Sequence, residues 1–319
     1  MRESLKTNKG ITLVALVVTI IVLILLAAVS INLVLGENGI LTKAQEGAQN
    51  YMVASNTEQQ EMENAVKFMN GDNTPDDEGK ETLVSQITAA NYGDSVAYSV
   101  KVGDVTLDNW KIFYNDPKTN NVIMIYNDYL PNSTGLATGA GLVTSGDYGV
   151  KSSTNREDLI NNLNDTSKWT SLVRSDLTGK ATAKGAVDLE TWVNSWNAKG
   201  YQKLYTAKKT GMSDSIGWGY YVGTSENPTS TYQDVSSFAG YNDALYYPVK
   251  VSEEKDWSYG YLLASPCSWD PLCLSSIYFE GSIADARYDW ADYSLCPIIY
   301  LSSNILTSGK DASGAWVIE

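Results

Sequence analysis

The residues of this chain that could do chemistry gather near its C-terminal end. The three cysteines are Cys267, Cys273 and Cys296, and no histidine occurs among the 319 residues. Without an imidazole, Ser-His-Asp and Cys-His hydrolase sites are excluded, as are zinc sites that need histidine. Three thiols are too few for a four-cysteine metal site. We therefore expect at most one disulfide, with the third cysteine left over.

Carboxylates in the same stretch offer two other kinds of chemistry. Asp285, Asp289 and Asp292 are close enough in sequence to hold calcium, but no EF-hand loop with its glycine and terminal glutamate is present. Glu280 and Asp289 could serve as the acid pair of a glycosidase, although any two carboxylates give that signal. We expect instead a solvated acidic rim, and we predict no metal, no cofactor, no catalytic residue and no enzymatic activity.

Aromatic side chains alternate with these polar residues and indicate recognition. Rigid rings supply contact area at low entropic cost, while Asp and Ser supply adaptable hydrogen bonds. On a strand over residues 277–283, Ile277 would face one side, and Tyr278 and Glu280 the other. We call residues 267–296 the contact segment. Its predicted ligand contacts are Trp269, Asp270, Tyr278, Glu280, Arg287, Tyr288, Asp289, Trp290, Asp292 and Tyr293.

The charge and the N-terminal sequence indicate where such a surface would act. The formal net charge is −14, which argues against nucleic acid as a partner, because that affinity depends on Lys and Arg. The run from Ile11 to Gly36 contains no charged residue and is long enough to span a membrane as a helix. The basic residues before it predict a cytoplasmic N-terminus and an extracellular C-terminal part.

The leader resembles that of type IV prepilins, in which a short basic peptide ends in glycine before an apolar helix. The matching residues are Lys9-Gly10 followed by Ile11-Thr12-Leu13-Val14. The resemblance implies that a prepilin peptidase cleaves after Gly10 and methylates Ile11, and it suggests other pilins as partners. Ala15 stands where that family usually has Glu, which leaves polymerisation open. Residues 37–80 are predicted to form a helical stalk and an acidic linker.

Residues 81–319 contain patterns for strands and for two capped helices. Turn residues between Trp110–Asp116 and Asn121–Asp128 predict a hairpin. Thr154 is the expected N-cap of one helix and Asp188 of another, which Gly200 ends. On the second helix Trp192 and Trp196 share one face. We expect this face to pack on the core, and a sugar platform is the alternative.

Three further elements resemble the C-type-lectin-like domains of bacterial surface proteins: Gly260–Pro266 (GYLLASP), the closing strand Ser294–Leu301 (SLCPIIYL) and the hairpin from Trp110. Leu262 and Leu295-Cys296 depart from that pattern. The resemblance implies an α+β fold: a long N-terminal transmembrane, pilin-type helix, followed by a C-type-lectin-like ectodomain with short antiparallel strands, a few helices and long loops. In such domains a retroelement can diversify the segment equivalent to residues 267–296.

The sequence therefore predicts a cell-surface, pilin-like ligand-binding or adhesion protein with four parts: a leader (1–10), a membrane helix (11–36), a stalk (37–80) and an extracellular domain (81–319). Its ligand would be a surface protein or a glycan. One alternative is a structural minor pilin or pseudopilin of a pilus, secretion or DNA-uptake machine. Another is an exported enzyme, either a glycosidase or one resembling formylglycine-generating enzymes.

Overall fold

The computed structural model describes residues 16–23, 80–210, 218–247, 260–268, 272–278, 280–291 and 293–319. Contacts divide the chain into two units, Met1–Asp77 and Glu78–Glu319. In the first unit the described residues, 16–23, form a helix. None of the helices in the described ranges is long and apolar enough to cross a membrane.

The predicted fold class is therefore wrong. The described chain is mostly β-sheet with a few short helices, and the long helix predicted over residues 11–36 is not seen. Strands dominate because Val, Ile, Tyr and Trp recur in short runs between turns, a pattern that suits a pleated surface. Glycines keep helices short, as at α4 (Leu136–Gly139), which begins after Gly135 and is followed by Gly141. The leader residues Gly10 and Ile11 and the predicted stalk, apart from Lys80, lie outside the described residues.

A four-stranded sheet contains the predicted hairpin. Strands β4 (Trp110–Asp116) and β5 (Asn121–Tyr126) pair antiparallel, and Asn120 in the turn adopts a φ of 55°. Strands β16 (Ile298–Leu301) and β8 (Ala181–Lys184) complete the order β4-β5-β16-β8. The prediction of a hairpin here is confirmed.

The largest sheet in the described ranges has seven strands, three of which belong to the contact segment. Its order is β11 (Gln233–Asp234), β14 (Ser282–Arg287), β13 (Cys273–Tyr278), β12 (Gly260–Pro266), β15 (Tyr293–Ser294), β7 (Gly149–Lys151) and β6 (Val143–Ser145). The single strand expected over residues 277–283 is wrong, because a turn at Glu280-Gly281 separates β13 from β14.

The remaining strands form small sheets. Strands β9 (Tyr205–Thr210) and β10 (Trp218–Gly223) pair with each other, as do β2 (Val100–Val102) and β3 (Val105–Leu107). Strand β1 (Glu81–Thr82) pairs with β17 (Leu306–Lys310), which also pairs with β18 (Trp316–Ile318). Lys80 forms an ion pair with Glu319 beside them. The two ends of the Glu78–Glu319 unit are thus joined in one sheet.

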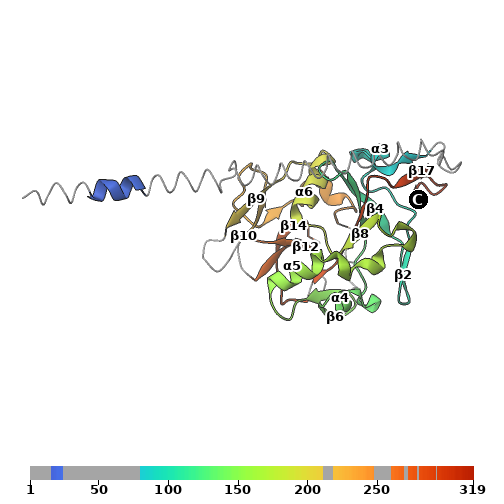
Figure 1. Ribbon diagram of the computed structural model, residues 1–319, viewed down its shortest axis with the longest axis horizontal. Coiled ribbons are helices and arrows are strands. Elements are labelled where there is room, and N and C mark those ends of the chain that lie inside the picture. The colour runs from blue at the N-terminus through green and yellow to red at the C-terminus, as the bar shows by residue number, and fades with distance from the viewer. Residues whose placement is uncertain are drawn as a thin grey trace, which may run out of the picture. The chain divides into compact units, whose positions relative to one another are not determined.

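Two helices pack on the larger sheets, and one of them bridges both (Figure 1). Helix α5 (Arg156–Asn164) lies on β12 and β13, and α6 (Leu189–Ala198) contacts both β12 and β4. The predicted cap of α6 is confirmed, because the Asp188 side chain accepts from the Thr191 N–H at 2.8 Å. The cap of α5 is Asn155 rather than Thr154. Helix α3 is short, spanning Leu83–Gln86, and ends at the C-cap Ile87.

The tryptophans of α6 lie at the centre of the core. Trp192 and Trp196 have no exposed surface, and their rings stack with centroids 5.3 Å apart. Trp192 Nε1 donates to the hydroxyl of Tyr261 at 2.8 Å, and Tyr246 packs edge-on against both indoles. The expectation that this face packs on the core is confirmed, and the sugar-platform alternative is excluded.

Candidate ligand-binding surfaces

The loop after β14 carries the most exposed tryptophan of the described compact unit. Trp290 has 49% of its surface exposed. The Arg287 guanidinium lies 5.8 Å from the centroid of the Trp290 ring and donates two hydrogen bonds of 3.0 Å to Asp289. These bonds from Arg287 lower the pKa of the Asp289 carboxyl, so the pair stays charged at neutral pH. We call residues 287–291 the Trp290 loop.

Backbone contacts hold this loop in place. The N–H of Tyr288 donates to the carbonyl of Leu272, and its carbonyl accepts from the N–H of Ser152, both at 2.8 Å. A Cβ at Gly149 would lie 2.0 Å from the carbonyl oxygen of Ala291, so strand β7 approaches the loop more closely than any other residue type would allow. The exposed indole is therefore presented on a fixed backbone.

The structure brings Arg287, Tyr288 and Asp289 together with Trp290, but not Tyr278, Glu280 or Tyr293. Tyr293 has no exposed surface, and its ring packs edge-on against the half-buried Tyr278. Glu280 is exposed but lies at the turn between β13 and β14, whereas Arg287 pairs with Cys273 at the far end of that hairpin. Tyr293 thus belongs to the core, and Glu280 lies apart from the Trp290 loop. Three further predicted contacts lie outside the described residues: Trp269, Asp270 and Asp292.

All three cysteines are buried. Cys267 and Cys273 lie at the adjacent ends of β12 and β13, where the N–H of Cys267 donates to the carbonyl of Cys273. Burial raises the pKa of Cys296 well above its usual value, which suppresses the thiolate that an enzymatic cysteine needs. In the described ranges no group of three or more Cys, Asp or Glu side chains is placed to hold a metal ion.

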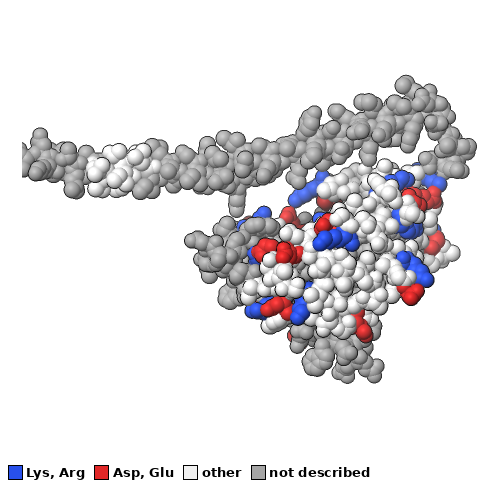
Figure 2. Space-filling model, turned by 60° about the horizontal axis from the view of Figure 1, so that its bottom comes forward, with Lys and Arg blue, Asp and Glu red and all other residues white. Residues whose placement is uncertain are grey.

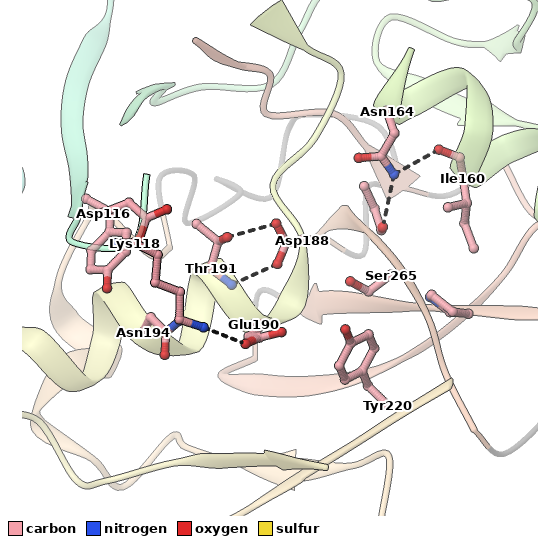
Figure 3. Close-up of a pocket in the computed structure, with 13 residues that line it drawn as sticks. Asp116, Lys118, Ile160, Asn164, Asp188, Glu190, Thr191, Asn194, Tyr220 and Ser265 are labelled. Carbon is pink, nitrogen blue, oxygen red and sulfur yellow. Dashed lines mark hydrogen bonds and ion pairs between the residues drawn. The ribbon is translucent and has the colours of Figure 1, made fainter. Parts of the chain in front are cut away.

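A cleft of about 480 Å³ lies where β4, α5, α6, β10 and β12 meet (Figure 3). It contains three carboxylates, one lysine, two tyrosines and several amide and hydroxyl groups. Its lining residues are Tyr114, Asp116, Lys118, Ile160, Asn164, Asp188, Glu190, Thr191, Asn194, Tyr220, Ala264, Ser265 and Pro266.

Local capping interactions position these groups. Asp188 is fixed by its two hydrogen bonds to Thr191, each of 2.8 Å, at the first turn of α6. Ser265 of β12 accepts from the N–H of Leu189 at 2.9 Å, which ties the helix start to the strand. The Lys118 ammonium reaches Glu190 at 3.4 Å across the edge of the cleft.

The carboxylates affect the tyrosines of this region. Burial, together with Glu190 and Asp188, raises the pKa of Tyr220 to about 12. Burial, with Asp116 next in size, raises the pKa of Tyr114 to about 12. Both phenols therefore remain protonated donors at physiological pH, beside a concentration of negative charge.

The cleft was not predicted from the sequence. Its residues come from five separated stretches, and only the cap at Asp188 carried a local signal. The cleft adjoins the contact segment, however, because β12 ends at Pro266 and the segment begins at Cys267.

The rest of the visible surface has no dominant charge. In Figure 2, basic and acidic side chains are interspersed between broad uncharged areas of the face shown. Comparisons with family models, curated proteins and solved structures found no match to this chain.

Proposed function

We propose that this protein binds a protein partner at the cell surface through the Trp290 loop. The observation that carries the proposal is the exposed Trp290 with Arg287 beside its ring, on a backbone fixed by Ser152, Leu272 and Gly149. Exposing a large apolar side chain to water is unfavourable in free energy, and a partner that covers the side chain removes this unfavourable contribution.

The residue types of the loop favour a protein as the ligand. Trp, Tyr and Arg are the residues enriched at the energetic centres of protein interfaces, and Trp290, Tyr288 and Arg287 lie within four positions. A preordered loop also lowers the entropic cost of binding. Export is supported by the leader-like sequence before Ile11, from which we propose display at the cell surface.

The proposal predicts how much binding energy Trp290 supplies. An indole side chain presents at most about 250 Å², and 49% of Trp290 is exposed. Covering that surface removes about 120 Å² from water, or about 3 kcal/mol at about 25 cal/mol per Å². Trp290→Ala should therefore weaken binding by more than about a hundredfold.

The experiment is a binding screen of the full-length protein on an array of purified extracellular proteins and on a glycan array. Tyr232→Ala is the matched control, because Tyr232 is another aromatic residue with 53% exposure. We expect protein spots that Trp290→Ala abolishes and Tyr232→Ala retains. Trp290-dependent binding to glycans alone would overturn the choice of a protein partner. The absence of any Trp290-dependent spot would contradict the proposal as a whole.

The proposed diversification of residues 267–296 has a separate test. If copies of the gene within one strain vary for recognition, substitutions should occur at exposed positions such as Trp290. Buried positions of β13, such as Leu274 and Ile277, should stay unchanged or apolar, since polar replacements there would disrupt the core. Substitutions spread evenly over both groups would contradict diversification for binding.

A further inference from the structure

A second binding site is independent of the Trp290 loop. We propose that the cleft between α5, α6 and β12 binds an aliphatic diamine or polyamine through its ammonium groups. Three features of the cleft favour such a ligand: the charges that line it, the hydroxyl of a largely buried tyrosine that forms no hydrogen bond within the described ranges, and the position of Lys118.

The first observation is charge inside a confined space. Asp116, Asp188 and Glu190 line about 480 Å³ of space, against the single cation of Lys118 in the lining. A second lysine, Lys184, lies nearby and donates to Oδ1 of Asn164 at 3.2 Å. Each carboxylate has about four lone-pair sites, so the capping bonds of Asp116 and Asp188 leave acceptors for a ligand.

The second observation is the hydroxyl of Tyr114. This side chain lines the cleft and is only 8% exposed, yet its hydroxyl forms no hydrogen bond within the described ranges. A ligand group that enters the cleft can therefore pair with this hydroxyl. The hydroxyl can accept from an ammonium, which is a donor only.

The third observation is that an ammonium of the chain already reaches the cleft. The Lys118 side chain is 74% exposed, and its Nζ lies 3.4 Å from Oε1 of Glu190, so this pair is weak. A ligand ammonium can therefore replace the Lys118 ammonium beside Glu190 with little loss of free energy. Ile160, Ala264 and Pro266 supply apolar surface for the methylene groups between ammonium groups.

Several ammonium groups fit this site better than one, since three separate carboxylates line it. Spermidine and putrescine are therefore the probes. The test is isothermal titration calorimetry of the full-length protein with each of them, with butane-1,4-diol as the uncharged analogue and with Nα-acetyl-lysine amide as the mimic of a lysine in a protein. We expect spermidine to bind most tightly and the diol not at all.

Matched variants separate the cleft from the general acidity of the chain. Glu190→Gln should weaken spermidine binding about fivefold, and Tyr114→Phe should also weaken it. Asp176→Asn is the control, because Asp176 pairs with Arg174, is 53% exposed at its side chain and lies outside the cleft. Lys118→Gln should tighten binding, a result that a purely structural role for Lys118 would not give.

Four outcomes would overturn the proposal. The first is that spermidine at millimolar concentration gives no heat of binding, and the second is that butane-1,4-diol binds as tightly as spermidine. The third is that Glu190→Gln and Asp176→Asn lower the affinity for spermidine equally, and the fourth is that Nα-acetyl-lysine amide binds as tightly as spermidine. The last would assign the cleft to a lysine side chain of a partner protein. Trp290→Ala should leave spermidine binding unchanged, so failure here is distinct from failure of the proposed function.

Discussion

Replacing the glycine at the start of β12 should destabilise the domain more than the small size of the change suggests. Gly260 has a φ of +147°, in a region that is essentially restricted to glycine. A Cβ there would lie 1.8 Å from the carbonyl oxygen of Ile277. The strand cannot move aside freely, because Gly260 pairs with Tyr278 on one side and with Tyr293 on the other.

The expected size of the effect follows from these contacts. The backbone conformation costs an alanine about 2 kcal/mol. Relieving the overlap separates Gly260 from Ile277 and weakens ladder hydrogen bonds worth about 1 kcal/mol each. Gly260→Ala should therefore cost about 4 kcal/mol or more, a loss that few single substitutions reach.

Urea unfolding of the full-length protein, followed by tryptophan fluorescence, measures this loss. Gly309→Ala is the control, because Gly309 also has a positive φ, of +87°, but has no atom within 4 Å of its Cβ position. The control should lose only about 1–2 kcal/mol. If both variants unfold at the same urea concentration, the close approach of Gly260 to Ile277 is not what requires glycine.

Three further predictions concern the core and the Trp290 loop. Asp243 accepts from Lys199 at 2.6 Å, and both side chains are largely buried, so Asp243→Ala should cost about 3 kcal/mol. Burial opposes ionisation of Asp243, but hydrogen bonds led by that from Lys199 outweigh it and lower the pKa, so this stabilisation is complete above the ordinary pKa of about 4. The stabilisation is lost as the pH falls through the lowered pKa of Asp243, so the difference in Tm between wild type and Asp243→Ala should narrow there. A Tm difference that stays constant from pH 7 to 2 would contradict this role for the Asp243 carboxylate. Iodoacetamide should label Cys296 only after unfolding, since the thiol is fully buried, and mass spectrometry that finds rapid labelling of the native protein would count against it. Trp290→Ala should change the free energy of unfolding by less than about 0.5 kcal/mol in the same urea assay, whereas a larger loss would mean that the indole is part of the core.

Elements with a complete local signal could be predicted from the sequence. Helix α6 has a capping Asp188, an apolar stripe that includes Trp192 and Trp196, and a closing Gly200, and it forms as expected. The β4–β5 hairpin likewise has its turn residues between two apolar runs.

The errors arose where tertiary contacts decide the structure. Alternation suggested that β13 would bury one face and expose the other, but its first five residues are all buried. Tyr278, the sixth, is half-buried, and its ring packs edge-on against Tyr293 rather than standing free. Periodicity cannot distinguish a strand covered on both faces from one that is half exposed. From the sequence, Tyr293 resembles the neighbouring aromatic residues predicted to lie on a loop. In the structure it pairs with Gly260 and Val150, and this places it in the core.

The cleft had no local signal because its shape depends on how distant elements meet. Asp116 ends β4 and Lys118 follows it, while Tyr220 belongs to β10 and Ser265 to β12. Each is ordinary in its own stretch of sequence. Only the contacts of α6 with both β4 and β12 bring them around one space.

The pairing of β1 with β17 gives the unit a modular character. Because the strand that enters the fold lies beside one of the last strands to leave it, a short linker could join the two ends without disturbing the interior. A circularly permuted chain, opened instead at an exposed turn such as the one at Thr119, should fold to the same structure. Because its two ends lie close together, the unit could also be inserted into a loop of an unrelated host protein. It would fold there as an independent domain and present the Trp290 loop.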